Sequence, residues 1–339
     1  MPVDPIQPIQ PLNTRQEISV TEPVGLAFER VKLMLFQPFD LGKWFVIGFC
    51  AWLAYLGEAG CGSGGNFGNH SGQSGTDIRH SLDQAKEWVL NNLDWIIPVA
   101  ALLVVIVVGM GLLILWLNSR GKFMFLHCVA LNRAEVTEPW NKFAPEANSL
   151  FWFRLGLGAA GMVLALPLVG IIAVLVLKMV YRGEPDAGSI LVSIGLAVIF
   201  ILLVLGFGIV KKFTVDFVVP IMRLRRCKCL AAWKEFYGLL SGRPGIFVLY
   251  LLFQIVLSLA IASLVVMAVL VTCCLSCCLL ILPYVGTVLL LPVLVFKRAY
   301  PLHFLAQFGP EYDVFPPLPT APPTPAPGLP PMPVAPPTP

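Results

Sequence analysis

The segment Cys273–Cys278, with the sequence CCLSCC, contains the residues of this chain best suited to metal or redox chemistry. Cysteines at Cys-x-x-Cys spacing bind zinc or exchange disulfides when a polar fold presents them. The flanking residues are apolar, however, and no histidine, carboxylate or lysine lies close in the sequence. We therefore expect these cysteines to pack between helices, and we assign the chain no metal, no cofactor and no catalytic residue.

A second set of reactive side chains lies between residues 57 and 94: Glu58, Cys61, His70, Asp77 and His80. Their spacing matches no established ligand pattern. The glycine-rich start of this stretch favours a hydrated loop. In the alternative interpretation Glu58, His70, His80 and the cysteines converge on the outer face and form the site of a membrane enzyme or a metal site.

The densest basic cluster is RLRRCKC at Arg223–Cys229. Each basic residue near an anionic membrane surface contributes about 1 kcal/mol, so this cluster predicts contact with lipid headgroups. Aromatic and basic residues of three short segments extend the predicted lipid-contact set. Its members are Phe28, Arg30, Lys32, Trp140, Lys142, Arg223, Arg225, Arg226, Lys228, Trp233 and Lys234.

The elements that position these residues belong to a membrane protein. Of 339 residues, 57% are apolar and only 12% are charged, a composition that excludes an ordinary soluble domain. A membrane-spanning helix needs roughly 20 apolar residues. We expect an all-α fold with six such helices, of which the first is the shortest: Trp44–Leu56, Trp95–Leu117, Phe151–Leu177, Ile190–Val210, Ile246–Thr272 and Leu279–Phe296.

The distribution of Lys and Arg predicts the orientation. With both termini on one side of the membrane, that side holds 19 of these residues and the other side holds four. Cytoplasmic loops carry such an excess. We therefore expect a multi-pass protein of a bacterial inner membrane with both termini in the cytoplasm, inserted through its first span because no signal peptide is visible.

The chain also shows a threefold repeat. The sequence VTEP occurs at Val20–Pro23 and at Val136–Pro139, each time before an aromatic-rich segment, and Ala231–Leu240 is a third such segment. The threonine of VTEP is expected to be the N-cap of a short helix. We predict three parallel repeats, each with one interfacial amphipathic helix and one transmembrane hairpin, at approximately 21–126, 127–216 and 217–310. The alternative for each short helix is a linker helix packed on the bundle.

Both ends of the chain are rich in proline. Residues 1–20 and 311–339 are expected to be disordered tails, and prolines every third residue favour polyproline II structure. An extended spacer and a docking segment for a protein partner are both compatible with this pattern. The sequence indicates neither a nucleic-acid partner nor an oligomeric state.

The sequence contains few features that are typical of transporters or hydrolases. No ionisable residue lies in the middle of a predicted span, and Arg154, Lys178 and Asp216 lie near ends where they are expected to reach water. No phosphate-binding loop, His-Glu-x-x-His or serine elbow is present. We expect a non-enzymatic membrane scaffold or lipid-associated module. A transporter or channel with a cavity near Gln254, Ser258 or the prolines Pro167, Pro283 and Pro292 is the alternative.

Three features carry a resemblance: QPFDLGKWFVIGFCAWLAYLGE, the repeated basic and aromatic segments, and FGPEYDVF before the final prolines. Over residues 20 to 315 the chain resembles uncharacterised bacterial polytopic membrane proteins. Its plan is similar to the membrane domain fused to some bacterial glycerophosphodiester phosphodiesterases. The catalytic domain of that family has no counterpart here, so the resemblance implies no catalytic residue.

Overall fold

The computed structural model describes residues 18–58, 88, 91–182, 187–271 and 282–315, and all regular structure within these ranges is helical. A short π-helical turn at Thr214–Val218 joins α7 to α8. The helices are α1 Glu22–Leu35, α2 Leu41–Tyr55, α4 Leu93–Leu131, α5 Thr137–Lys142, α6 Ala144–Arg182, α7 Ala187–Phe213, α8 Val219–Arg225, α9 Cys229–Gly242, α10 Pro244–Val271, α12 Pro283–Leu289 and α13 Leu291–Ala306.

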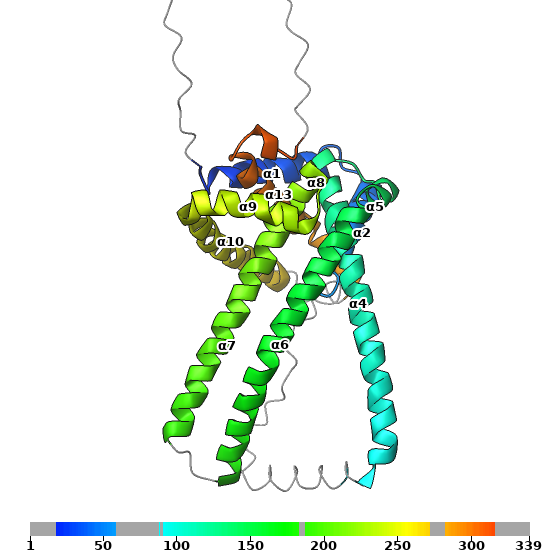
Figure 1. Cartoon of the computed structure of the whole chain (residues 1–339). Helices are drawn as coiled ribbons and strands as arrows, with labels where there is room; N and C mark the ends of the chain where they lie inside the picture. The colour runs from blue at the N-terminus through cyan, green and yellow to red at the C-terminus, as the bar shows by residue number, and fades with distance from the viewer. Residues whose placement is uncertain (1–17, 59–87, 89–90, 183–186, 272–281, 316–339) are drawn as a thin grey trace, which may run out of the picture.

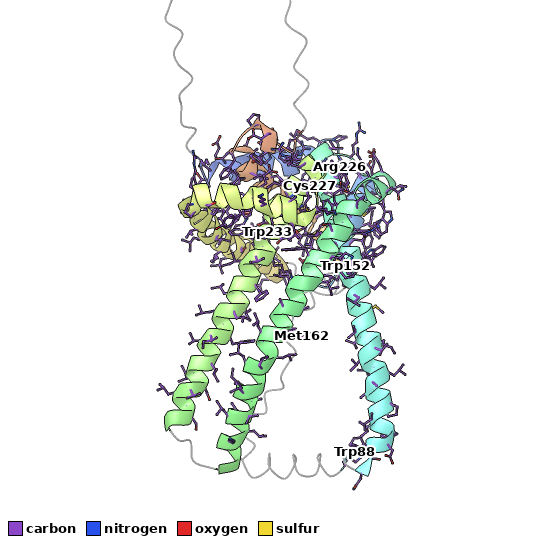
Figure 2. All side chains as sticks on the ribbon, in the orientation of Figure 1. Trp88, Trp152, Met162, Arg226, Cys227 and Trp233 are labelled. Carbon is purple, nitrogen blue, oxygen red and sulfur yellow. The ribbon has the colours of Figure 1, made fainter. Side chains whose placement is uncertain are left out.

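Four helical segments are long and apolar enough to cross a membrane: Leu93–Leu131, Ala144–Lys178, Gly188–Arg225 and Pro244–Val271. Their most apolar windows are 0 to 6% buried. A helix that exposes apolar side chains on every side is typical of a membrane span, since lipid takes the place of a protein core. Figure 2 shows side chains projecting outward along these helices, Met162 of α6 among them.

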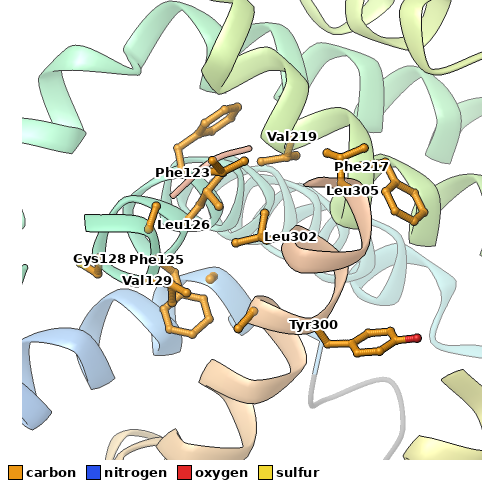
Figure 3. Packing of buried hydrophobic residues seen from close by; sticks show 14 of the residues in the cluster. Phe123, Phe125, Leu126, Cys128, Val129, Phe217, Val219, Tyr300, Leu302 and Leu305 are labelled. Carbon is orange, nitrogen blue, oxygen red and sulfur yellow. The ribbon is translucent and has the colours of Figure 1, made fainter. Parts of the chain in front are cut away.

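The opposite pattern holds at one end of the molecule, which we call the cap. There α1, α2, α5, α8, α9 and α13 pack around the adjoining ends of the long helices (Figure 1). The last part of α4 is completely buried, including Phe123 and Leu126. Figure 3 shows these residues against Val219 of α8 and against Leu302 and Leu305 of α13.

The first predicted span corresponds to α2, a helix of 15 residues. It lies against the cap end of α4, where Gly121 lets the two backbones approach closely. A Cβ atom at Gly121 would stand 2.5 Å from the backbone nitrogen of Ala54 and from the carbonyl carbon of Leu53. Glycine is therefore needed at this helix contact. Asn118 lies on α4 just before Gly121. Its side-chain amide donates to the carbonyl oxygens of Ala54 and Leu56.

The sixth predicted span is divided in the structure. Helix α12 ends at Leu289, and α13 starts at Leu291. Pro292 lies in the first turn of α13, where proline is tolerated because that turn needs no N–H donor. Helix α13 then packs inside the cap, with Val295 and Ala299 fully buried. By contrast, Pro167 leaves α6 continuous.

Of the two predicted threonine N-caps, Thr21 occupies the N-cap position of α1, whereas Val136 and not Thr137 is the N-cap of α5. Neither Thr21 nor Val136, which precedes Thr137, makes a side-chain capping hydrogen bond. Ser19 accepts instead, from the backbone N–H groups of Thr21 and Glu22, at 3.3 Å each. A serine hydroxyl satisfies the free donors of a helix start as well as threonine does, and here it lies two residues earlier.

The described chain ends both lie on the cap. Ser19 and Gln307 exchange two hydrogen bonds, of 2.7 Å and 2.9 Å, and the Tyr300 hydroxyl donates to the carbonyl of Val20. Tyr312, close to the C-terminal end of the described residues, is also buried. The predictions for CCLSCC, for Cys61, His70, Asp77 and His80, and for the proline-rich residues 1–17 and 316–339 lie outside the described residues.

Candidate functional site: a basic and aromatic groove on the cap

A groove of about 660 Å³ lies where the start of α6 meets the turn between α8 and α9. We call it the basic groove. Figure 2 labels three of its residues, Trp152, Arg226 and Cys227. Its lining comprises Pro145, Glu146, Asn148, Ser149, Trp152, Phe153, Arg226, Cys227, Lys228, Cys229 and Leu230.

Local backbone geometry builds this groove. Helix α8 ends at Arg225, and the next residue, Arg226, has a φ of 52° in the left-handed region, which turns the chain toward α9. The backbone N–H of Cys229 then donates to the hydroxyl of Ser149 at 3.0 Å, which ties the start of α9 to α6. Arg226 pairs with Glu146 at 3.1 Å and lies 4.7 Å from the ring centre of Phe143. The wall on this side is thus fixed by an ion pair and a cation–π contact.

The open side of the groove is amphipathic. Trp152 is 68% exposed and Leu230 is 73% exposed. Lys228, which lines the same groove, is exposed and forms no ion pair with another described residue. An indole, an isobutyl group and an unpaired ammonium together suit the boundary between hydrocarbon and headgroups.

The two cysteines of the groove are not set up for nucleophilic chemistry. Both are free thiols. Burial raises the pKa of Cys227, and it raises the pKa of Cys229 to about 12. A thiol acts as a nucleophile or a metal ligand in its thiolate form, which these environments disfavour at neutral pH.

Four of the predicted lipid-contact residues, Phe28, Lys32, Lys228 and Lys234, are exposed and form no ion pair with another described residue. Phe28 and Lys32 lie on the open side of α1, and Phe28 is 64% exposed. Lys234 is exposed on α9. Lys142 is half-exposed but pairs with Glu138 one helical turn earlier. These side chains, together with Lys228, present the positive and aromatic character that the sequence indicates.

Other members of the predicted set hold the cap together. Arg30 donates to the carbonyls of Val129 and Ala130 and lies over Phe315. Trp140 packs on Trp116 with Arg120 over both rings. Three more members contact protein groups in the same way: Arg225 pairs with Glu235, Arg223 lies beside Phe143, and Trp233 packs on Phe153 and Phe236. The sequence cannot separate these two groups, since both combine basic and aromatic residues on amphipathic helices.

A second cavity, of about 300 Å³, lies where α2, α7 and α13 meet, and we call it the boundary pocket. Glu58 on its wall pairs with Lys122 at 3.0 Å and with Arg154 at 3.4 Å. Burial alone would raise the pKa of Glu58, but these cations outweigh it and hold the pKa below its usual value. The lining residues are Tyr55, Glu58, Gly208, Lys211, Lys212, Val215, Asp216, Lys297 and Arg298.

The expectation that Arg154 and Asp216 reach water was wrong. Their side chains are 9% and 5% exposed. Asp216 pairs with Lys212 at 2.9 Å and accepts a hydrogen bond from the Tyr250 hydroxyl at 2.8 Å. A buried charge needs such partners, because its transfer from water is costly. Lys212 and Asp216 have the i,i+4 spacing of a helical ion pair, but no sequence signal pairs Asp216 with Tyr250, which lies on a different helix.

Among the described residues, one group could hold a metal ion by geometry alone. The ligand atoms of His127, Glu135 and Glu138 lie within 4.8 Å of one another. Both carboxylates already have cationic neighbours, with Lys142 at 3.3 Å from Glu138 and Arg133 at 3.8 Å from Glu135. We assign no ion to this group.

The fold and the two cavities define a polytopic helical membrane protein with a packed, basic cap. The family model that matches the chain is described as a family of unknown function, DUF7544, and it covers residues 18–283. The chain belongs to that family. No curated protein and no solved structure matches it. The family description names no activity, and it does not link the chain to the membrane domain of the phosphodiesterases.

Proposed function

We propose that this protein is a non-enzymatic, lipid-associated scaffold of a cell membrane, whose cap binds anionic headgroups through the basic groove and the open side of α1. The basic groove is the observation that carries this proposal. It places an unpaired ammonium, Lys228, beside the exposed indole of Trp152 at the level where the apolar surface of α6 begins. Electrostatic attraction and burial of the aromatic ring would then act on the same lipid molecules.

In the proposed layout the cap faces the cytoplasm of a bacterium and the chain crosses the membrane six times, in three parallel repeats. Three short helices precede outward-going segments: α1 before α2, α5 before α6 and α9 before α10. Helix α4 begins at the end remote from the cap (Figure 1). We assign the first crossing to the predicted span Trp44–Leu56, which overlaps α2, and the sixth to the predicted span Leu279–Phe296, which includes α12.

Two fusions test this layout. A green fluorescent protein at either terminus folds and fluoresces in the bacterial cytoplasm, whereas an exported alkaline phosphatase is active only outside it. We expect fluorescence from both terminal fusions and no phosphatase activity. Active phosphatase at either end would reject the proposed orientation. In the proposed orientation the proline-rich segment after residue 315 is on the cytoplasmic side, where it either docks a protein partner or serves as a spacer.

The lipid contact is tested with variants of the open side of the basic groove. Lys228→Gln combined with Trp152→Ala leaves the Arg226–Glu146 pair intact, whereas replacing Arg226 would break that pair. We expect the double variant to purify with less anionic phospholipid per chain than the wild type, and the difference to shrink at high salt because ions screen exposed charges. Lys178→Gln is the matched control, since it removes an exposed lysine at the other end of α6. Equal anionic lipid in all three proteins would reject the proposal.

A further inference from the structure

We propose that the boundary pocket and the apolar groove beside it form one specific binding site for a single anionic phospholipid, with the phosphate at Arg298 and one acyl chain between α6 and α7. This inference deepens the proposed lipid association, on which it rests, by assigning it a second and distinct site. The basic groove lies beside exposed side chains of the cap, whereas the boundary pocket is lined by the buried residues Asp216 and Arg298.

Arg298 is the first argument. Arg298 is only 4% exposed. Its Nη1 donates a hydrogen bond to the carbonyl of Val215 at 2.7 Å. Its Nε and Nη2 are buried and have no partner. A buried guanidinium with free N–H groups is costly, and a phosphate or carboxylate is the group that satisfies two of them at once.

The backbone explains why Arg298 is held in this position. The turn at Thr214–Val218 is π-helical, so the N–H of Val219 donates to Thr214 instead of Val215. The next donor in π register for Val215 would be residue 220, which is a proline and has no N–H. The carbonyl of Val215 is thereby free to accept from Arg298. π-Helical turns inside long helices occur frequently at functional sites.

Charge balance is the second argument. Four cationic residues line the pocket, Lys211, Lys212, Lys297 and Arg298, against two carboxylates, which leaves a surplus of two positive charges. Both carboxylates are already paired, as described above. Lys297 is exposed and forms no ion pair with another described residue. An anion in this pocket would therefore face unpaired positive charge.

The adjoining groove identifies the anion as a lipid. A cavity of about 430 Å³, mostly apolar, runs between α6 and α7 and shares Gly208, Lys211 and Val215 with the boundary pocket. Along α6 it extends from Arg154 to Ala165, or roughly 16 Å at the rise of an α-helix, which is about half the thickness of the hydrocarbon core. Free phosphate would leave this groove empty. A phospholipid of the cap-side leaflet would fill both parts.

Two substitutions separate the headgroup from the acyl chain. Gly158 lines the groove, and a Cβ atom there would meet nothing within 4 Å. Gly158→Leu therefore fills the groove without distorting α6. Gly170→Leu is its matched control, because Gly170 lies on the same helix, also has open space around it, and does not line the groove. Lys297→Gln removes a headgroup contact, and Lys178→Gln again serves as the charge control.

The experiment measures binding to lipid-stripped protein by native mass spectrometry, with phosphatidylglycerol, phosphatidylcholine and glycerol 3-phosphate as separate probes. We expect one tightly held phosphatidylglycerol per chain, resistant to high salt, and binding of the other two that is weaker by roughly tenfold or more, as loss of charged hydrogen bonds or of apolar burial predicts. Gly158→Leu should weaken phosphatidylglycerol alone. Lys297→Gln should weaken both phosphatidylglycerol and glycerol 3-phosphate, and the two controls should leave all three unchanged.

Three results would overturn the inference. Equal binding of glycerol 3-phosphate and phosphatidylglycerol would identify a soluble phosphate as the ligand. Unchanged phosphatidylglycerol binding in Gly158→Leu would remove the groove from the site, and equal binding of the zwitterionic lipid would remove the charge argument. The scaffold proposal is tested separately. The basic-groove variant Lys228→Gln with Trp152→Ala is expected to reduce the salt-sensitive lipid and to leave the single tightly held lipid in place, so one proposal can fail without the other.

Discussion

Gly121→Ala tests a close helix contact in the cap, the one that joins α2 to α4. Inside a helix the change from glycine to alanine by itself stabilises by about 0.5–1 kcal/mol, because alanine loses less backbone entropy on folding. Here the new methyl group would meet the backbone of Leu53 and Ala54 at 2.5 Å. Backbone atoms of a packed helix cannot rotate away, so α2 must shift.

The two effects oppose each other, and the clash is the larger. Overpacking a well-packed core costs about 1–3 kcal/mol, and a contact with backbone on both sides lies at the upper end of that range. The net loss of stability is then about 2 kcal/mol, which corresponds to roughly 4–8 °C in Tm for a domain of this size. Gly109→Ala is the matched control, since a Cβ atom at Gly109, also on α4, would meet nothing within 4 Å.

A thiol-reactive dye follows the unfolding in detergent, because Cys50 and Cys128 are fully buried on α2 and α4. They lie beside each other, with their sulfur atoms 3.8 Å apart. We expect dye labelling of Gly121→Ala to begin at a lower temperature than in the wild type, and labelling of Gly109→Ala at the same or a higher one. If both variants label alike, α2 does not pack on α4 as described, and the assignment of the first crossing is lost with it.

Three further predictions concern the ends and the interior of the cap. Ser19→Ala should lower stability by about 0.5–2 kcal/mol, whereas Thr21→Ala should have a smaller effect, since the serine caps α1; chemical denaturation of the two variants compares them. Tyr250→Phe removes a buried hydrogen bond to Asp216 and should cost about 1–3 kcal/mol in the same assay. Burial, reinforced by the charge of Arg30, lowers the pKa of His303 to about 4 in the folded protein. As the pH falls, the unfolded chain, whose histidine pKa is near 6.5, therefore binds a proton before the folded chain does. Stability should therefore be full above about pH 6.5 and decrease toward pH 4, and His303→Gln should reduce that slope; an unchanged slope would contradict the assignment.

The membrane character and the helical class were predictable, because composition and run length decide them. An apolar run such as Trp95–Leu117 can only be helical in lipid, where every backbone group must be bonded within its own segment. The four long helices confirm this part of the prediction. The short helices α1 and α9 were also expected, since their apolar residues recur at helical spacing.

The interior of the cap was not predictable in the same way. A run such as Leu279–Phe296 reads as one span, but tertiary packing divides it at Leu290 and buries α13 among other helices. Likewise, nothing near Arg298 in sequence shows that its partner is a carbonyl freed by a π-helical turn 83 residues earlier. Long-range pairs of this kind depend on helix placement, which hydropathy does not determine.

The distinction within the predicted lipid-contact set has the same origin. Arg30 and Lys32 lie two positions apart on α1, so they point to different sides of the helix. Arg30 contacts the carbonyls at the end of α4, and Lys32 remains exposed. Which side of α1 is open follows from where α13 and α4 pack, and that information is absent from the local sequence.

The composition of the lipid that surrounds the protein in its own membrane tests the central claim most directly. Polymer extraction excises the protein with its neighbouring lipids, and mass spectrometry then compares those lipids with the bulk membrane. If the cap binds anionic headgroups, the excised discs are enriched in anionic phospholipid relative to the bulk, and the Lys228→Gln, Trp152→Ala variant loses part of that enrichment. Discs with the composition of the bulk membrane would contradict the account.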